Sequence, residues 1–345
     1  MPTEGPATLA TVAASAGVSV ATVSKVLNGR ADVGPETRAR VESLLAQHEY
    51  VVRRADGRAT DSQPTIELVF HGWLSAYSLE IMQGVVAAAT EADTAVAVSI
   101  RPRQAQPPDE RRTSSWARHL TAVGRRAVID VVDDVREGDL AALSRARLPL
   151  VVIDPLNVPR RQVTSVGATN FSGGLTATQH LLECGHRRIA YLGTDVNSAH
   201  NQARMHGYRA AMDAAGVDVA EGYVRSGRSF YEDGVNGGAV LLDLPERPTA
   251  VFAATDEVAA GVLEAARVRG LRVPQDLSVV GFDDTEVARL LSPPLTTVRQ
   301  PLREMGRVAV RTALRLANGE TLESHHVELA TDLVVRGSTA PPPVS

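Results

Sequence analysis

Apolar residues near the start of the chain recur with the period of an α-helix. Leu9, Val12, Ala13 and Ala16 repeat at i, i+3, i+4 and i+7, which places them on one face of a helix. Gly17 follows directly. Because Ala16 and Gly17 are small, this position predicts a tight turn at which two helices approach closely.

A second helix is predicted immediately after this turn. Ser19 can cap its first turn, and Val23, Val26 and Leu27 would form its inner face. The side chains left for the outer face are short, adaptable or cationic: Val20, Ala21, Thr22, Ser24 and Lys25. Two short helices hinged in this way are typical of a helix-turn-helix, which lays its second helix in the major groove of DNA. An ordinary helical hairpin is the alternative interpretation.

A third helix and a linker are predicted next. Pro35 suits a first helical position, where its missing N–H costs no hydrogen bond. The apolar stripe of this helix runs through Val41, Leu44, Leu45 and His48. The polar segment that follows, residues 51–64 (VVRRADGRATDSQP), has the composition of a linker.

From residue 65 onward, short runs of Val, Ile and Leu alternate with helical stretches, the rhythm of a parallel sheet with crossover helices. The continuous apolar character of these runs indicates strands covered by helices on both faces. The predicted strands are 65–70, 94–100, 126–132, 149–153, 188–193, 249–254 and 277–282.

The amino-terminal pattern resembles the DNA-binding domain of the lactose-repressor (LacI/GalR) family of bacterial transcription regulators, through the turn AGVS and the segment TVSKVLN. Further motifs follow in family order: GHRRIAYLG (185–193), RMHGY (204–208), VFAATDEVAAG (251–261), VPQDLSVVGFDD (273–284) and PPLTTVRQP (293–301). The resemblance covers nearly the whole chain. It implies an all-α helix-turn-helix domain followed by an α/β periplasmic-binding-protein-like sensor of two doubly wound lobes.

The same resemblance implies a division of the chain into domains. The DNA-binding domain would span residues 1–60, with a hinge or linker at 51–64, and the effector-binding and dimerisation domain would span 65–336. Lobe 1 would comprise 65–162 and 294–324, lobe 2 would comprise 163–292, and residues 337–345 would form a flexible tail.

Composition narrows the class of protein. The chain has no apolar run of about 18 residues and begins without a signal-peptide pattern. Its single cysteine, Cys184, excludes a disulfide framework. These features predict a cytoplasmic protein, associated with the nucleoid if it binds DNA. Residues 1–60 carry seven Lys and Arg against six Asp and Glu, so a single DNA-binding unit should bind weakly and a homodimer is expected.

The resemblance assigns roles on the second helix. Val20, Ala21 and Lys25 match the positions that read bases; Lys25 can donate to guanine, and the two apolar side chains can contact thymine methyl groups. Thr22, Ser24 and Asn28 suit phosphate contacts. The full set of expected DNA-binding residues is Thr8, Ser19, Val20, Ala21, Thr22, Ser24, Lys25, Asn28, Arg53, Arg54 and Arg58.

The linker departs from the family, whose hinge helix wedges a leucine into the minor groove. That leucine position falls at Ala59, and Gly57 disfavours a helix just before it. Three arginines remain, and arginine favours a narrow minor groove. We therefore expect a hinge that contacts DNA through Arg53, Arg54 and Arg58 and bends it less.

The effector pocket is expected at the carboxyl ends of the strands, between the lobes. Arg204 and Asp283 match the family's ligand-binding arginine and aspartate, and Asp154 and Thr255 close two predicted strands. Asp256 is expected to cap the helix that follows Thr255. A lobe-to-lobe salt bridge without a ligand role is the alternative for the charged residues.

Aromatic residues are only 4% of the chain, which makes their positions informative. Trp73 or Phe230 is expected to stack on a sugar ring, against the alternative of plain core packing. Asn170 either caps a helix or faces the ligand. The full set of expected effector-binding residues is Trp73, Tyr77, Ser78, Asp154, Asn170, Arg204, Phe230, Thr255 and Asp283. His71 is a weaker candidate.

The sequence predicts no cofactor, no metal and no enzymatic activity. It has no G-x-S-x-G elbow, no phosphate-binding glycine loop and no zinc-ligand spacing. Asp130, Asp133 and Asp134 are expected to lie in solvated turns. An enzyme and a pure sugar-binding protein are the alternatives to the favoured function, a sugar-responsive transcriptional regulator, more specifically a repressor, that binds pseudo-palindromic operator DNA.

Overall fold

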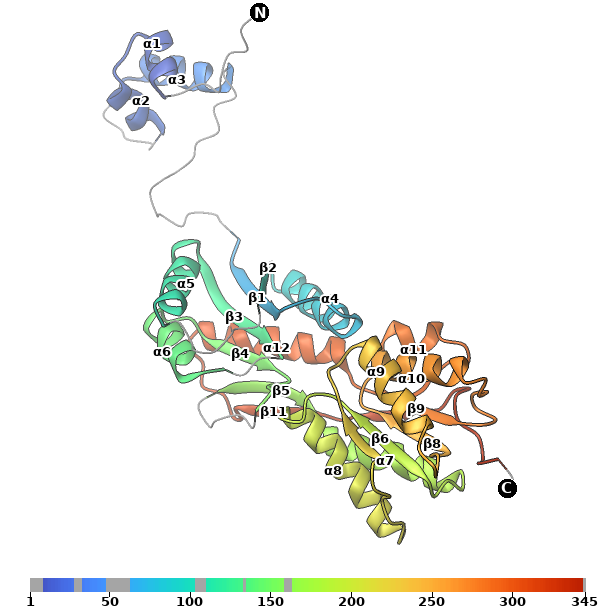
Figure 1. The fold of residues 1–345 in the computed structure, drawn as a ribbon. Helices are drawn as coiled ribbons and strands as arrows, with labels where there is room; N and C mark the ends of the chain where they lie inside the picture. Colours follow the sequence, from blue (N-terminus) through green and yellow to red (C-terminus); the bar gives the residue numbers. More distant parts are fainter. Residues whose placement is uncertain are drawn as a thin grey trace, which may run out of the picture. The chain divides into compact units, whose positions relative to one another are not determined.

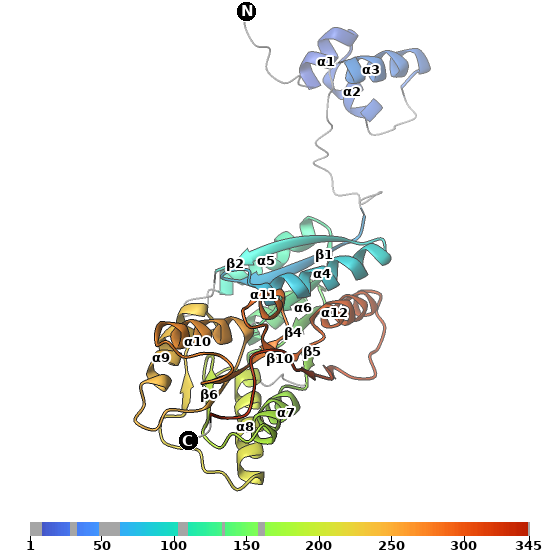
Figure 2. The same ribbon diagram turned by 90° about the vertical axis from the view of Figure 1, so that its right-hand side faces the viewer.

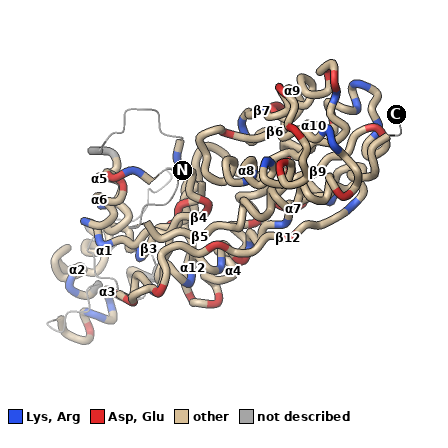
Figure 3. The backbone as a smooth tube through the Cα atoms, turned by 90° about the horizontal axis from the view of Figure 1, so that it is seen from below, with Lys and Arg blue, Asp and Glu red and all other residues tan. Residues whose placement is uncertain are grey.

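The computed structural model describes residues 9–27, 33–47, 63–102, 110–132, 135–157 and 163–343. The chain divides into two compact units, residues 1–60 and residues 61–345 (Figure 1). Basic and acidic residues are interspersed in the described parts of both units (Figure 3), so neither carries a large field of one sign.

The smaller unit contains the three predicted helices, α1 (Leu9–Ala16), α2 (Val20–Leu27) and α3 (Pro35–Gln47). Their common core is apolar and consists of Val12, Ala13, Ala16, Val23, Val26 and Val41. Leu9, Leu44 and Leu45 pack against this core from its edge. The predicted inner faces are therefore confirmed for Leu9, Val12, Ala13 and Ala16 on α1 and for Val23 and Val26 on α2, while the side chain of Leu27 lies outside the described part of the structure. His48, at the end of the predicted third stripe, lies outside the described residues.

The turn between α1 and α2 differs in its physical basis from the prediction. Gly17 has a φ of +68°, and a Cβ atom placed on it would meet nothing within 4 Å. The glycine is therefore required by the left-handed backbone conformation, and close approach of the helices plays no part at this position. Ser19 caps α2 as predicted, since the backbone N–H of Thr22 donates to Ser19 Oγ at 3.1 Å.

The larger unit contains two sheets, and each forms the centre of one lobe (Figures 1 and 2). The lobe 1 sheet is parallel with strand order β11-β5-β4-β3-β1-β2. Helices α4 and α12 cover one face, and α5 and α6 cover the other. The strands are β1 (Thr65–His71), β2 (Ala95–Arg101), β3 (Arg125–Val131), β4 (Leu150–Ile153), β5 (Thr164–Ala168) and β11 (His326–Leu329); the helices are α4 (Ala76–Glu91), α5 (Glu110–Ala122), α6 (Glu137–Arg145) and α12 (Leu302–Ala317).

The lobe 2 sheet has the order β12-β10-β9-β8-β6-β7 and is parallel except for β12. Helices α7 and α8 cover one face, and α9 and α10 cover the other. The strands are β6 (Ile189–Gly193), β7 (Val224–Ser226), β8 (Ala250–Ala253), β9 (Ser278–Asp283), β10 (Thr296–Arg299) and β12 (Asp332–Val334); the helices are α7 (Asn170–Glu183), α8 (Ala199–Ala214), α9 (Tyr231–Leu242), α10 (Asp256–Val268) and α11 (Glu286–Leu290).

The lobe limits expected from the sequence need correction at three strands. β5 belongs to the lobe 1 sheet although it lies inside the range 163–292, and β10 belongs to the lobe 2 sheet although it lies inside 294–324. β11 extends lobe 1 beyond residue 324. The chain therefore crosses between lobes after β5, after β10 and after β11, since the strand that follows each of them in the chain belongs to the other sheet.

Close packing of α7 against α8 positions a functional side chain. A methyl group on Gly174 of α7 would clash with the backbone carbonyl of Arg204 on α8, and one on Gly207 would clash with the carbonyl of Phe171. A glycine on each helix thus lets the two backbones approach closely. The backbone of α8 at Arg204 therefore lies directly against α7, within reach of Asn170 at the start of that helix.

Residues 337–343, the described part of the predicted flexible tail 337–345, contradict that prediction. Ser338 is fully buried. Its hydroxyl donates to Val279 O at 2.6 Å, its carbonyl accepts from Val279 N at 2.9 Å, and Thr296 N donates to its Oγ at 2.8 Å. The segment therefore packs along β9 and β10 as part of lobe 2.

His186 holds the same segment at Ala340, two residues after Ser338. Its Nε2 lies 2.9 Å from Ala340 O, and its Nδ1 lies 2.8 Å from Thr249 Oγ1. Because a carbonyl only accepts, Nε2 carries the hydrogen and Nδ1 accepts from the threonine hydroxyl. Burial lowers the pKa of His186, which keeps the imidazole neutral. The histidine of the motif GHRRIAYLG is thus a structural anchor.

Deleting residues 338–345 is expected to destabilise the larger unit by about 2–4 kcal/mol, because several buried hydrogen bonds to β9 and β10 are lost together. The free energy of unfolding in urea measures the effect. Deleting only residues 343–345 is the matched control and should leave stability unchanged. Equal stability of the two truncated chains would contradict the anchoring role of Ser338 and Ala340.

Candidate functional site

A cavity of about 110 Å³ lies between the lobes, at the carboxyl ends of strands from both sheets. Lobe 1 contributes the segment after β1, the start of α4 and the end of β4. Lobe 2 contributes α8, the start of α10 and the end of β9. Parallel strands end at the same edge of a sheet, so this arrangement brings distant segments of the chain to one place.

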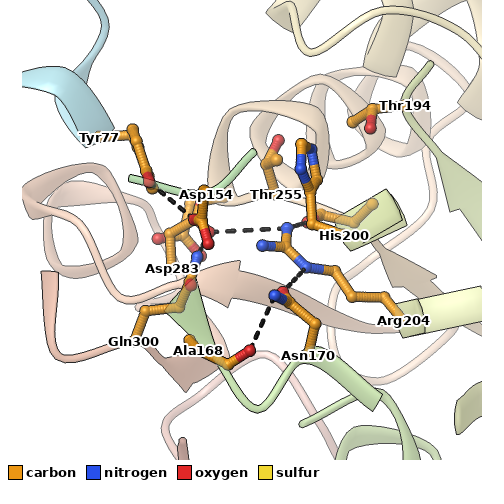
Figure 4. Close-up of polar contacts among 12 residues, drawn as sticks. Tyr77, Asp154, Ala168, Asn170, Thr194, His200, Arg204, Thr255, Asp283 and Gln300 are labelled. Carbon is orange, nitrogen blue, oxygen red and sulfur yellow. Dashed lines mark hydrogen bonds and ion pairs between the residues drawn. The ribbon is translucent and has the colours of Figure 1, made fainter. Parts of the chain in front are cut away.

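Arg204 is the central cation of this cavity and is only 3% exposed. Its Nε donates to Asn170 Oδ1 at 2.8 Å, and its Nη1 donates to Ala254 O at 2.6 Å (Figure 4). The same Nη1 lies 3.7 Å from Asp283 Oδ1, and the guanidinium carbon lies 3.7 Å from the centre of the Phe282 ring. These contacts fix the direction in which Arg204 presents its remaining donors.

Asp283 ends β9 beside Arg204. Its φ of +110° is rare for a residue with a side chain and costs of order 1–3 kcal/mol, which is typical of functional positions. Gln300 Nε2 donates to Asp283 Oδ1 at 2.7 Å. Burial raises the pKa of Asp283 to about 7, although Arg204 and Gln300 both favour the ionised form.

Asp154 faces the cavity from lobe 1, at the end of β4. Tyr77 of α4 donates its phenolic hydrogen to Asp154 Oδ2 at 2.7 Å (Figure 4). Burial raises the pKa of both side chains, so Tyr77 remains a donor at neutral pH. Arg204 pairs with Asp283, and both residues belong to lobe 2. Asp154 pairs with Tyr77, and both residues belong to lobe 1. A salt bridge between the lobes is therefore not the arrangement of these three charges.

The start of α10 corrects one expectation. Thr255 is the capping residue, since its hydroxyl oxygen accepts from Val258 N at 3.1 Å. Asp256 was expected to be the cap and is instead buried in lobe 2, where it accepts from Thr285 N at 2.8 Å and from Thr297 Oγ1 at 2.6 Å. Asp256 is therefore a structural link between α10, the start of α11 and strand β10.

Two aromatic side chains meet at the rim of the cavity. Trp73 of lobe 1 and Phe230 of lobe 2 lie with ring centroids 4.2 Å apart and ring planes inclined at 41°. Trp73 is 39% exposed, which distinguishes it from a core residue. The pair forms an apolar surface beside a cluster of hydrogen-bonding groups, the combination that binds a ring with hydroxyl groups.

The smaller unit presents a candidate DNA-recognition helix. Along α2, Val23 and Val26 are buried, while Val20, Ala21 and Lys25 are exposed. This separation of faces leaves the predicted base-reading side chains on the solvent side of the helix. Thr22 and Ser24 are half-buried, and the Thr22 hydroxyl lies 2.9 Å from Ser19 Oγ.

Comparisons with known proteins place both units in one family. Residues 8–52 match the model of bacterial regulatory proteins of the lacI family, and residues 178–339 match a periplasmic binding protein-like domain. The transcriptional regulator CelR of Thermobifida fusca is 36% identical over 340 residues, covering 96% of this chain and 98% of its own. The chain belongs to the LacI family. It is a DNA-binding transcriptional regulator and not an enzyme.

Other LacI-family members are similar over the same extent. Catabolite control protein A of Priestia megaterium is 30% identical over 336 residues, covering 96% of this chain and 99% of its own. The structure of a CelR–cellobiose complex is similar with a TM-score of 0.72 and 34% identity, covering 96% and 99% of the two chains. The lac repressor dimer bound to operator and anti-inducer has a TM-score of 0.72 and 27% identity, covering 97% and 100%.

The structure gathers most of the residues predicted for the effector site of this LacI-family chain. Those that line the cavity are Trp73, Tyr77, Ser78, Asp154, Arg204, Thr255 and Asp283. Asn170 is not among the lining residues, and Thr169 is the N-cap of α7, so neither alternative for Asn170 holds; it accepts from Arg204 Nε and positions the guanidinium. Phe230 lies against Trp73, next to the lining residue Ser229. Of the predicted DNA-binding residues, those that lie outside the described part of the chain are Thr8, Asn28, Arg53, Arg54 and Arg58.

Three polar residues of the site are among those that sequence reasoning missed. His200 lines the cavity and stands four residues before Arg204, so helical spacing on α8 could have revealed it. Glu257 also lines the cavity, and its position directly after the predicted residues Thr255 and Asp256 could have revealed it. Gln300 contacts Asp283 from just after β10, and its place in the motif PPLTTVRQP is the signal that could have revealed it.

The structure offers no support for a metal site or a membrane span in the residues it describes. The expectation of a solvated turn is wrong for Asp130, which is buried in β3 with its Oδ1 2.7 Å from His71 Nε2, because the imidazole offers the carboxylate a buried partner. Asp133 and Asp134 lie outside the described residues. Within the described ranges, no cluster of three His, Cys, Asp or Glu side chains could hold a metal ion. None of the helices in those ranges has the length and apolar character needed to cross a bilayer.

Proposed function

We propose that this LacI-family regulator is a homodimeric repressor whose operator binding is controlled by a small sugar or sugar-like effector bound between the lobes. The observation that carries the proposal is the cavity in which Arg204, Asp154 and Asp283 meet beside Trp73. Such a protein works on the nucleoid, in the cytoplasm. The relatives include the CelR–cellobiose complex and a ribose operon repressor of Escherichia coli, 30% identical over 336 residues.

The polar groups of the cavity suit adjacent hydroxyl groups on a ring. Asp154 and Asp283 can each accept a hydroxyl hydrogen, while the guanidinium of Arg204 can donate to hydroxyl oxygens. The exposed face of Trp73 would cover the C–H surface of the ring. Because the acceptors come from both lobes, a ligand that bonds to both stabilises the closed arrangement of the lobes.

Charge favours a neutral effector over a phosphorylated one. Four carboxyl side chains line the cavity, those of Asp154, Asp256, Glu257 and Asp283, against the single guanidinium of Arg204. Burial raises the pKa of each of these carboxyl groups, because buried negative charge is unfavourable there. An anionic ligand would add negative charge beside these carboxyl groups, whereas the hydroxyl groups of a neutral polyol would donate hydrogen bonds to the carboxylate oxygens.

The expected result is a rise in melting temperature with neutral sugars and none with their phosphates. Cellobiose, ribose and glucose, compared with glucose 6-phosphate and ribose 5-phosphate, form the test set in thermal-shift measurements at pH 7. A ligand at about 100 times its Kd adds about 2.7 kcal/mol of stability, which is readily measured. Stabilisation by the phosphates alone would contradict the assignment of a neutral effector.

Operator binding is tested with the same full-length chain. Sequences selected from a random duplex pool are expected to be pseudo-palindromic, since a two-fold dimer presents two recognition helices. Each sugar that raises the melting temperature is then added to the bound complex. Effector binding either releases or strengthens DNA binding, according to the lobe arrangement it prefers, and an unchanged affinity with every bound sugar would overturn the proposed control.

An apolar surface supports the homodimer. Leu79 and Val86 on α4 and Val98 and Ile100 on β2 are 45–53% exposed, although each is a large apolar side chain. β2 is also the edge strand of its sheet. Exposed apolar side chains grouped on neighbouring elements are typical of a subunit interface. A second copy of the chain would cover them and hold two DNA-binding units as a pair.

A further inference from the structure

Among the described residues, the contacts that join the two lobes around the ligand cavity include the following three. On one side, Ala76 N of α4 donates to Glu257 Oε1 of α10 at 3.3 Å, and Trp73 stacks on Phe230. On another, Ala199 N of α8 donates to Leu156 O at 2.6 Å. Only the first of these uses a charged side chain, and it lies in the wall of the cavity itself.

The start of α10 leaves Glu257 available for this contact. The Thr255 hydroxyl is used to cap α10, and the Asp256 carboxylate is used by Thr285 and Thr297 within lobe 2. Glu257 is the third residue of this run, and its carboxylate reaches into lobe 1. Thr255 and Asp256 thus make contacts within lobe 2, whereas Glu257 makes a contact between the two lobes.

The partner of Glu257 is the first residue of a helix. The first N–H groups of a helix have no acceptor within the helix, and negative charge is favourable near them. Ser75 caps α4 by accepting from Ser78 N at 3.3 Å, and Glu257 accepts from Ala76 N. The next residue of α4 is Tyr77, which donates to the ligand-facing carboxylate of Asp154.

We propose that Glu257 is a positioning residue that holds the ligand cavity closed by capping helix α4 from the opposite lobe. When the contact forms, Tyr77 and Asp154 of lobe 1 are held opposite Arg204 of lobe 2. When it breaks, the lobes are free to separate on this side of the cavity. The inference rests on the proposed function for its biological meaning, but the contact itself can be tested without effector or DNA.

The chain provides its own optical probe for this test. It has two tryptophans, Trp73 and Trp116, and Trp73 lies at the junction of the lobes. Replacing Trp116 by phenylalanine leaves Trp73 as the only tryptophan of the full-length protein. Quenching of its fluorescence by acrylamide then reports how far the lobes are open beside Phe230.

In this background, Glu257→Ala is expected to shift the closed-to-open ratio about tenfold, the size of one charge-assisted hydrogen bond, and to raise the quenching constant about twofold. Glu257→Gln keeps the volume and an acceptor but loses the charge, so its effect should be intermediate. Glu264→Ala is the matched control: this carboxylate lies on the same helix but pairs with Arg267 within lobe 2, and quenching should not change.

Quenching of both Glu257 variants equal to that of the parent would overturn the proposal. Circular dichroism checks that each variant is folded, and the conservative glutamine keeps the test valid if alanine unfolds the chain. With a neutral sugar that raises the melting temperature, Glu257→Ala should weaken its binding about tenfold. A change in quenching without any sugar binding would support the contact and contradict the sugar proposal, so the two fail separately.

Discussion

Lys25→Ala is expected to weaken operator binding by the dimer by about 2–6 kcal/mol. A good contact to a base edge is worth about 1–3 kcal/mol, and a two-fold dimer loses two such contacts with one substitution. Lys25 is exposed on α2, and it is the single lysine of the chain. Its neighbours Val20 and Ala21 offer only apolar contact, so no other base-reading side chain on α2 can replace its hydrogen bonds.

Fluorescence anisotropy with a selected operator, at one fixed salt concentration, measures this loss. Arg40→Ala, which removes an exposed cation from α3, is the matched control for net charge. Repeating the selection with the Lys25→Ala protein should show relaxed preference at one base position in each half-site. Equal weakening on every sequence would show that Lys25 contacts only phosphate.

The uniqueness of Lys25 allows a chemical test of the same prediction. Acetylation with an amine-specific reagent modifies Lys25 and the chain terminus, and no other side chain of this sequence carries an amine. Bound operator should protect Lys25 from modification, and prior acetylation should reduce operator affinity as the alanine variant does. Modification at the same rate with and without operator would contradict a direct contact.

Arg204→Met is expected to reduce effector affinity by about 100-fold or more and to lower the stability of the larger unit by about 3–5 kcal/mol. Removal of one partner from a buried ion pair leaves the other charge uncompensated. Asp283 would lose Arg204, and the acceptors on Asn170 and Ala254 would lose their donor. The thermal-shift assay with the best neutral sugar and urea unfolding measure the two effects.

A second substitution separates binding from stability. Adding Asp283→Asn to Arg204→Met removes the unpaired carboxylate, so part of the stability should return while effector binding stays lost. Arg204→Lys keeps the charge but lacks the planar donor set, and intermediate affinity is expected. Operator affinity without sugar should remain close to that of the parent in each folded variant. Full effector affinity in Arg204→Met would contradict the central role of this side chain.

The sequence by itself predicts the elements whose pattern is local. The helical period of apolar residues between Leu9 and Val26 predicts α1 and α2. Each of the seven predicted apolar runs forms a strand, and both ends of each strand lie within one residue of the prediction. These features depend on neighbours three or four residues apart, or on one continuous run of apolar side chains. The family motifs also place Arg204 and Asp283, and the end of the predicted strand 149–153 places Asp154.

The tertiary structure alone decides the features that depend on distant partners. Strands β5, β7, β10, β11 and β12 are short, and polar residues or glycine interrupt their apolar positions, so they lack the continuous apolar run that marks the predicted strands. Pairing assigns each of them to a lobe. Ser338 is anchored in a tail of turn-like composition because β9 and β10 offer it hydrogen-bonding groups.

The same distinction separates the helix-turn-helix from the cavity. The fold of the three short helices follows from residues close together in the chain. The roles of Asp256 and Glu257 do not, since both are carboxylates in the first turn of α10 and differ only in what surrounds them. One meets Thr285 and Thr297 inside lobe 2, and the other meets the start of a helix in lobe 1. Only the packing of the lobes determines which carboxylate stabilises the core and which closes the cavity.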